Sequence, residues 1–181
     1  GHPYEYQGTS EITHFLWVLD EHPEVLDGKI TNALKGTQVA CYYGCHILRP
    51  APVMNHESGD YPESFERLVR RLGADPVWFD AGRKCCGFHA QFTAERDVLT
   101  ATGQIAASAD RAGANLIATP CPLCQMQLDM YGPEGREAVH SQTEMPVLHL
   151  QQLVGLALGM TKDEVGFNRH VSAREKLKIG G

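Results

Sequence analysis

Six cysteines are the residues of this 181-residue chain most able to do chemistry. They fall in three close pairs, Cys41 and Cys45, Cys85 and Cys86, and Cys121 and Cys124. Three disulfides are one interpretation, but small disulfide scaffolds are rich in loops, and the segments between these cysteines have the patterns of ordinary helices and strands. A metal centre instead needs several thiolates that converge from neighbouring loops. The spacing therefore favours a metal centre in a reduced, cytoplasmic setting.

Length and composition exclude several other classes of function. A chain of 181 residues with 43% hydrophobic side chains can bury the core of one domain. The net charge of −6 argues against a nucleic-acid partner, because such binding needs clustered Lys and Arg. No run approaches the roughly 18 apolar residues of a membrane span. The sequence also lacks the G-x-G-x-x-G and P-loop patterns of nucleotide sites. We expect a soluble protein.

The elements that must position the cysteines alternate between helices and strands. An amphipathic helix is predicted over Thr9 to Val25, with Ser10 as its N-cap. Further helices are predicted over 62–72, 93–112, 123–130 and 151–158, and strands over 37–43, 77–79, 115–119 and 146–150. Alternation with short connections predicts an α/β fold, a mainly parallel open sheet with helices on both faces.

The chain divides into three parts along its length. Residues 1–36 are predicted to be an N-terminal helical segment, residues 37–160 the cysteine-containing domain, and residues 161–181 a polar tail. The tail holds the one basic stretch, Arg169 to Lys178. We expect this stretch to be a solvated terminal segment, with docking onto an acidic partner as the alternative.

Each pair of cysteines lies at or just beyond the C-terminal end of a predicted strand. In a parallel sheet these ends share one edge, which is where open α/β folds place their ligands. Backbone N–H groups at the following helix N-termini would favour the thiolate form. The pattern therefore predicts that thiolates from separate loops converge at this edge.

The complete cysteine set resembles the cysteine-rich CCG domain of the heterodisulfide reductase B-type subunit. That family's motif is a cysteine, a gap of a few tens of residues, Cys-Cys-Gly, a similar gap and Cys-x-x-Cys. Here it is met by Cys45, then Cys85-Cys86-Gly87, then Cys121-Pro122-Leu123-Cys124. The resemblance covers about residues 30 to 172, and the neighbouring segments 40–45, 48–50, 121–126 and 146–148 look like the second of the two such domains in that family.

The resemblance implies a noncubane [4Fe–4S] cluster held by five thiolates. The ligands carried over from the family motif are Cys45, Cys85, Cys86, Cys121 and Cys124. Cys41 is left out of this set. The implied function is electron transfer from an iron–sulfur subunit of the heterodisulfide reductase C type to a disulfide or thiol substrate. Two adjacent cysteines suit different irons of an extended cluster better than they suit one tetrahedral zinc ion.

Members of that family carry two CCG domains that face each other, whereas this sequence shows one motif. Either the chain is the C-terminal half of a longer subunit, or it is a one-domain relative that needs a second CCG domain as a partner. Two alternatives also stay open. One is a structural module with zinc on four thiolates, and zinc could also enter an air-exposed preparation. The other is an electron relay without its own substrate.

Several residues beside the motif are weaker candidates. His46 and His89 could bind a metal or supply a proton, although loop histidines more often bond to backbone. Tyr42-Tyr43 and Trp78-Phe79 are expected in the core or lining the centre. Arg49 and Lys84 could offset thiolate charge or be ordinary surface cations. His56, His149 and His170 are expected to lie farther from the sheet edge, and His14, His22 and His140 have no cysteine near them in the sequence.

Overall fold

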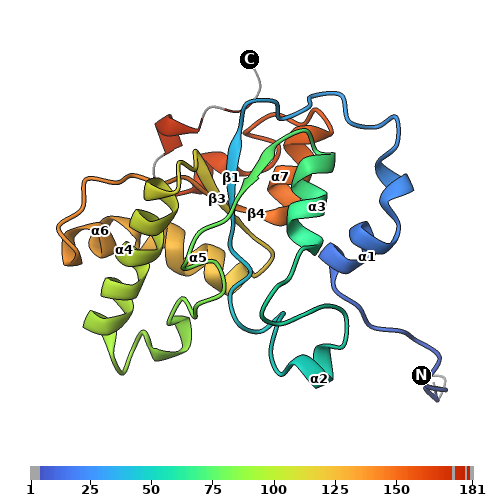
Figure 1. Ribbon diagram of the computed structural model, residues 1–181, viewed down its shortest axis with the longest axis horizontal. Coiled ribbons are helices and arrows are strands. Elements are labelled where there is room, and N and C mark those ends of the chain that lie inside the picture. Colours follow the sequence, from blue (N-terminus) through green and yellow to red (C-terminus); the bar gives the residue numbers. More distant parts are fainter. Residues whose placement is uncertain (1–4, 173, 178, 180–181) are drawn as a thin grey trace.

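The computed structural model describes residues 5–172, 174–177 and 179 of the chain. Helices and strands alternate along these residues (Figure 1). The order is α1 Phe15–Glu21, β1 Gln38–Cys41, α2 Ala51–Met54, α3 Ser64–Arg71, β2 Asp75–Val77, α4 Glu95–Arg111, β3 Leu116–Thr119, α5 Pro122–Met130, α6 Gly132–Ala138, β4 Val147–His149 and α7 Leu150–Ala157. Short 3-10 turns lie at Pro23–Leu26, Phe88–Ala90, Phe167–Arg169 and Arg174–Lys176.

The four strands form one open sheet in the order β2-β1-β3-β4, and every neighbouring pair is parallel. The connection from β1 to β2 carries α3, and the connection from β2 back across to β3 carries α4. The predicted α/β fold with a parallel open sheet is therefore confirmed. Because β1 lies between β2 and β3, the direction of the strand order changes beside it.

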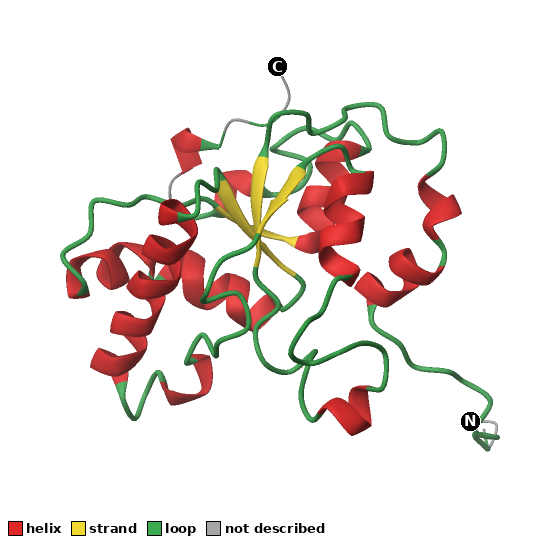
Figure 2. Cartoon of the chain, viewed as in Figure 1, coloured by secondary structure: helices red, strands yellow, loops and turns green. Residues whose placement is uncertain are grey.

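The side chains of β1 alternate between two hydrophobic layers, one on each face of the sheet. Val39 and Cys41 face the layer that contains residues of α1, α3 and α7. Ala40 and Tyr42 face the layer that contains residues of α4 and α5. Figure 2 shows the same division, with helices on both sides of the central strands. The alternation follows from the two-residue period of a strand that is buried on both faces.

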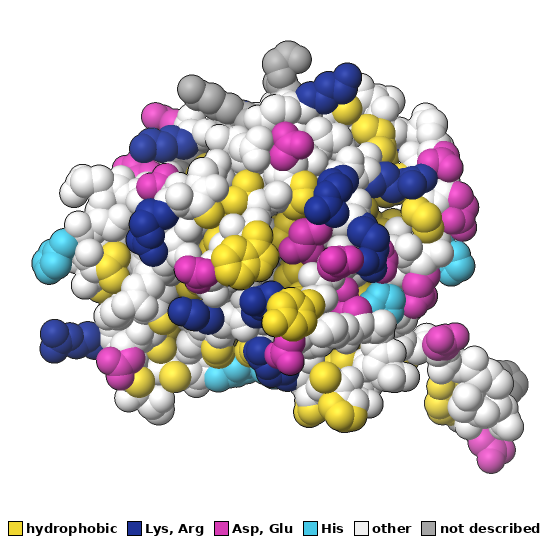
Figure 3. Space-filling view, in the orientation of Figure 1, with side chains coloured by type: hydrophobic (Ala, Val, Ile, Leu, Met, Phe, Trp, Pro, Cys, Tyr) yellow, Lys and Arg dark blue, Asp and Glu magenta, His cyan; other side chains and the backbone are white. Residues whose placement is uncertain are grey.

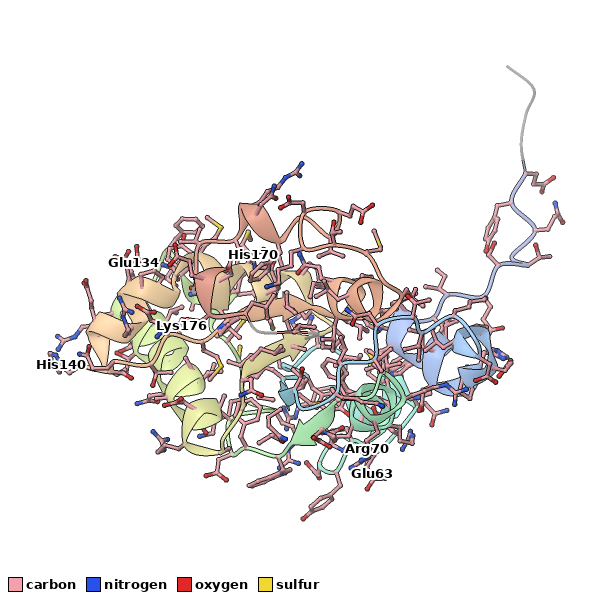
Figure 4. All side chains as sticks on the ribbon, turned by 90° about the horizontal axis from the view of Figure 1, so that it is seen from above. Glu63, Arg70, Glu134, His140, His170 and Lys176 are labelled. Atoms are coloured by element: carbon pink, nitrogen blue, oxygen red, sulfur yellow. The ribbon has the colours of Figure 1, made fainter. Side chains whose placement is uncertain are left out.

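The N-terminal helix is shorter than the predicted range of Thr9 to Val25. His14, rather than Ser10, is the N-cap of α1, and its Nδ1 accepts a hydrogen bond from the backbone N–H of Leu16 at 3.1 Å. Ile12 is 94% exposed. Figure 4 shows the described residues before α1 extending away from the body of the fold. Helical periodicity continues into this segment, but the described residues offer it no packing surface that would stabilise another turn.

The predicted strand over 77–79 is also displaced, because β2 ends at Val77. Phe79 is buried as expected, whereas the Trp78 side chain is 64% exposed. The expectation that Trp78 lies in the core or lines the centre is wrong. β2 is an edge strand, so a side chain just beyond its end can turn outward.

Part of the basic C-terminal stretch packs on the fold, while the side chains of Arg169 and Lys176 are exposed. His170, Ser172 and Leu177 are buried. The Asp129 carboxylate on α5 accepts a hydrogen bond from the backbone N–H of Ser172 at 3.0 Å, and the labelled His170 lies against the body in Figure 4. The prediction of a solvated segment is wrong for these residues, because their apolar and hydrogen-bonding groups find partners on the fold. Lys178 lies outside the described residues.

Two features of the α4 and α6 region differ from what the sequence pattern suggests. Leu99, at an inward position of the predicted helix, is only partly buried, and Val98 takes the buried position. Helix α6 is not among the predicted helices, because its sequence contains a proline and two glycines. Its Gly135 packs closely on α4, since a Cβ added at Gly103 would lie 2.1 Å from the carbonyl oxygen of Gly135.

We expect Gly103→Ala to destabilise the fold. In an exposed helix, alanine stabilises the helix by about 1 kcal/mol relative to glycine. Here the added methyl group would meet the backbone of α6, and such overpacking costs about 1 to 3 kcal/mol. The free energy of unfolding in urea should therefore fall. The exposed neighbour Gln104→Ala is the control and should leave that free energy nearly unchanged. An unchanged or higher value for Gly103→Ala would contradict the close packing of α4 on α6.

Candidate metal centre

Five of the six cysteines line one pocket beyond the C-terminal ends of β1, β2 and β3. Its volume is about 150 Å³, and its walls are Cys45, His46, Cys85, Cys86, Phe88, His89, Cys121, Pro122, Leu123 and Cys124. The Sγ atoms of Cys45 and Cys85 are 3.9 Å apart although 40 positions separate them in the sequence. All six thiols are free. The structure thus brings together the five cysteines named from the motif.

Cys41 is separated from these five by the sheet. It is buried in the layer of α1, α3 and α7, whereas Cys86 and Cys124 belong to the layer of α4 and α5. Its Sγ lies 3.9 Å from the carbonyl oxygen of Val39. Burial raises the pKa of the Cys41 thiol well above its usual value. Cys41 therefore packs as a small hydrophobic side chain.

Two glycines make room for the thiols. Gly44 has a φ of +73°, and a Cβ built on it would lie 2.8 Å from the Sγ of Cys124. Gly87 has a φ of +83°, and its N–H donates to the Sγ of Cys85 at 3.3 Å. Residues with a side chain rarely adopt this left-handed conformation. Gly44 therefore lets the loop after β1 approach the Cys-x-x-Cys segment, and Gly87 lets the loop after β2 turn back toward the Cys85 thiol while it packs against Val98.

The thiols differ in their readiness to ionise. A hydrogen bond from the Cys124 thiol, and then backbone N–H groups at the start of α5, lower the pKa of Cys121 to about 6. The Cys124 thiol likewise lowers the pKa of Cys86 to about 7. Burial, and then the neighbouring Cys85, raise the pKa of Cys45 to about 11. As donor to both neighbours, Cys124 has its own pKa raised. Ionisation is thus favoured first at the helix N-terminus, as expected for thiolates there.

Tyr42 is buried in the layer that lies beside the thiols. It packs in the same layer as Cys86 and Cys124, and its hydroxyl donates to the carbonyl oxygen of Lys84 at 2.7 Å. Burial, and then nearby thiolates, raise its pKa, so the hydroxyl stays protonated. The expectation that Tyr42 is buried in the core is confirmed. Tyr43 is buried too, but points to the opposite layer, where it bonds to Glu66.

A buried amide network joins the Cys-Cys-Gly loop to the helix of the Cys-x-x-Cys segment. The Nε2 of Gln127 donates to the Oε1 of Gln91 and to the Oγ1 of Thr102, each at 3.1 Å. All three residues are buried. Buried polar groups are costly unless paired, so the two bonds of the Gln127 amide nitrogen favour one placement of the Cys-Cys-Gly loop on α5. The Oε1 of Gln127 is buried without a partner among the described residues. No local sequence pattern signals this network, because the two glutamines are 36 positions apart.

His46 and His89 lie together at the pocket. Their rings stack, with centroids 5.3 Å apart and an angle of 28° between planes, and both line the same walls as the thiols. His46 also contributes to lowering the pKa of Cys121. The loop histidines therefore contact each other beside the centre, and their chemical role stays a prediction.

His14 and His149, neither of which the sequence places near the centre, flank its Cys-x-x-Cys loop. Burial lowers the pKa of each, partly offset by the carbonyl group of Pro120, which precedes Cys121. They line a wide cavity of about 540 Å³ together with Pro120, Pro122, Gln125, Gln151 and Gln152. Because Pro122 also lines the thiol pocket, the loop lies between the two cavities. For His149, its position at the end of a predicted strand could have indicated that it lies near the centre. For His14, no feature of the sequence indicates this.

The donor set consists of thiols, the ligands that iron–sulfur clusters use. The five thiols surround a volume, with Cys86 and Cys124 at its buried side and Cys85 at the exposed side. Thiolates on several irons would be spread in this way.

Comparison with known proteins agrees with the motif. The family model described as a cysteine-rich domain, CCG, matches residues 39–129. The chain belongs to the CCG cysteine-rich domain family. The resemblance to the heterodisulfide reductase B-type subunit is thereby confirmed, since the chain is 33% identical to that subunit of the ferredoxin/F420H2-dependent CoB-CoM heterodisulfide reductase of Methanosarcina acetivorans. That match covers 92% of this chain and 56% of the relative.

A second relative of this CCG domain comes from a different complex. The chain is 46% identical to the 8-methylmenaquinol:fumarate reductase membrane anchor subunit of Wolinella succinogenes, over 95% of this chain and 61% of the relative. The chain thus spans about three fifths of the length of these curated relatives. Among the described residues, no helix has the length and apolar character needed to cross a membrane.

A solved structure shares the fold. The crystal structure of a hypothetical protein from Helicobacter pylori matches with a TM-score of 0.69 and 12% identity, over 92% of this chain and 30% of that one. At this identity the likeness concerns the fold alone.

The unequal ionisation of the thiols predicts an order of alkylation in the metal-free domain. Between pH 6 and 11, Cys121 is mostly thiolate and Cys45 mostly thiol. Although a low-pKa thiolate is intrinsically less nucleophilic, we expect iodoacetamide to modify Cys121 at pH 7 at least about tenfold faster than Cys45. Peptide mapping by mass spectrometry measures both rates.

Two variants test the cause of this order. Cys124→Ala removes the hydrogen-bond donor and should slow the alkylation of Cys121 at pH 7. Cys41→Ala, across the sheet, should leave it unchanged. Equal rates for Cys45 and Cys121 in the unsubstituted domain would show that the thiols are not differentiated in this way.

Proposed function

We propose that Cys45, Cys85, Cys86, Cys121 and Cys124 hold one noncubane [4Fe–4S] cluster. The observation that carries this proposal is the convergence of the five motif cysteines, from three separate loops, on one pocket. Such a cofactor supplies one-electron redox chemistry and an iron that can accept a substrate sulfur. Cys41 lies outside this set, on the other face of the sheet.

The protein's own residues would bind, shield and open the centre. Tyr42 and the buried Cys86 and Cys124 exclude water from the inner side. The exposed Cys85 and the partly exposed Cys45 lie toward solvent. A cofactor that is buried on one side and accessible to solvent on the other can exchange electrons with a partner or substrate. The surrounding protein sets its reduction potential. Free thiols suit a reduced, cytoplasmic setting.

The function that we propose is electron transfer within a heterodisulfide reductase-like complex. Electrons would come from an iron–sulfur subunit of the heterodisulfide reductase C type and pass to a disulfide or thiol substrate, with a second CCG domain completing the active site. The named relatives in heterodisulfide reductases support this assignment.

A second candidate is electron exchange with a quinol. It is supported by the 46% identity to the 8-methylmenaquinol:fumarate reductase subunit and by the cavity of His14 and His149, whose described lining residues include no carboxylate or ammonium group. Such a wall suits an uncharged ring better than an anionic thiol. The two candidates separate by substrate: oxidation of the reduced, cluster-loaded protein complex by a water-soluble menaquinone analogue supports the second, and oxidation by organic disulfides supports the first.

The ligand set is tested by single substitutions in an anaerobic preparation. Cys85→Ser and Cys86→Ser should each lose most of the bound iron and the visible absorption near about 400 nm, because each removes one thiolate from the set. Cys41→Ser should retain most of both. Metal analysis should find iron rather than zinc. Equal losses in all three variants, or stoichiometric zinc with no iron, would show that the proposed centre is wrong.

The completeness of the site is tested by turnover. Reduction of a disulfide takes two electrons and yields two thiolates that must both be bound. One cluster transfers only one electron at a time. We expect this chain alone to show redox chemistry of its cluster but little steady disulfide reduction. Activity should appear when a second CCG domain and an electron-donating iron–sulfur subunit are added. Brisk turnover by the loaded chain with only a chemical reductant would instead make it a self-sufficient reductase.

A further inference from the structure

Two exposed aromatic side chains and an arginine lie near the end of the edge strand β2. None of them belongs to the candidate ligand set. Trp78 is 64% exposed and Tyr61 is 79% exposed. The guanidinium carbon of Arg83 lies 5.9 Å from the centroid of each ring. Large exposed aromatic side chains together with arginine are typical of residues that dominate protein interfaces.

Two further cations extend this patch toward the thiols. Lys84 is exposed and immediately precedes Cys85. Arg49 is also exposed, and its Nη1 donates to the carbonyl oxygen of Arg83 at 3.1 Å. We call Arg49, Tyr61, Trp78, Arg83 and Lys84 the basic aromatic patch. Figure 3 shows hydrophobic and Lys or Arg side chains adjoining near the centre of this face.

The backbone beneath the patch is held in place. The carbonyl oxygen of Lys84 accepts a hydrogen bond from the Tyr42 hydroxyl at 2.7 Å. The N–H of Tyr43 donates to the carbonyl oxygen of Gly82 at 2.9 Å. Because a surface fixed before binding loses less entropy when a partner docks, this loop is suited to recognition.

The charge of the patch opposes that of the whole protein. The chain carries a net charge of −6, yet three cations gather here beside the exposed thiol. Carboxylates also adjoin them. Asp80 lines the same pocket as Lys84 and Cys85, Glu66 lies in the hollow lined by Trp78 and accepts a hydrogen bond from Tyr43, and the exposed Asp60 directly precedes Tyr61. A local positive field beside the exposed end of a redox centre would attract and orient an acidic partner.

We propose that the basic aromatic patch is the docking surface for an acidic iron–sulfur protein that exchanges electrons with the centre through its Cys85 side. This inference rests on the proposed function and names the face and chemistry of the partner. Electron transfer needs close approach, and Cys85 is the exposed thiol of the motif. The C-terminal basic stretch is less suited to this role, since part of it packs on the fold.

The test measures electron exchange between the cluster-loaded protein and a purified, strongly acidic [4Fe–4S] ferredoxin by stopped flow. At low salt, the double variant Arg83→Glu/Lys84→Glu should lower the second-order rate constant by about tenfold or more and remove most of its decrease with rising ionic strength. Trp78→Ala should lower the rate several-fold at all salt concentrations, because it removes contact area rather than charge.

The matched control is Lys29→Glu/Lys35→Glu, which makes the same change of net charge at exposed positions before β1. It should change the rate less than about twofold. Patch variants that react at the unsubstituted rate, or a control that slows as much as the charge reversal, would overturn the proposal.

Iron content and reduction by dithionite are measured for each variant. If the unsubstituted protein binds no iron, the proposed function fails; if it loads and is reduced while the patch variants behave normally, only the docking surface fails.

Discussion

Parallel pairing of β1 with both β2 and β3 is the constraint on which the candidate centre depends. It places the C-terminal ends of three neighbouring strands at one edge, so that three loops distant in sequence begin side by side. The strand order reverses beside β1, and the chain leaves β1 toward α3 on one face and β3 toward α5 on the other. A crevice opens where such connections diverge, and ligands of open α/β sheets bind there. The motif cysteines line that crevice.

Bringing five thiols together has a physical cost that the surrounding residues reduce. Thiolates repel one another, and burial disfavours their charge. The start of α5 and the hydrogen bonds of Cys124 favour ionisation at Cys121 and Cys86. Gly44 allows the close approach of two loops that a side chain would hold apart. The buried Gln127 network then fixes the Cys-Cys-Gly loop, which follows β2, against α5.

The surroundings of the centre differ from side to side. The thiol pocket is walled by stacked histidines and apolar side chains. Behind the Cys121 loop lies the cavity of His14 and His149, and beside Cys85 lies the basic aromatic patch. The same thiols thus lie between a cavity whose described lining residues include no carboxylate or ammonium group and the basic aromatic patch.

The sequence by itself determined the order of most helices and strands and the parallel sheet, and its resemblance to the CCG motif singled out the five cysteines that line one pocket. It could do so because periodicity of 3.6 or 2 residues, glycine at helix ends and cysteine spacing are local signals. It did not determine where the first helix begins, since Ile12 continues the pattern but stays exposed. It misplaced Trp78, because edge position is a property of the sheet and not of the strand. Only the tertiary structure put Cys41 on the opposite face, joined Gln91 to Gln127 and brought His14 beside Pro120. The last two are contacts between residues tens of positions apart in the sequence. Tertiary packing determines such contacts, and no local pattern indicates them.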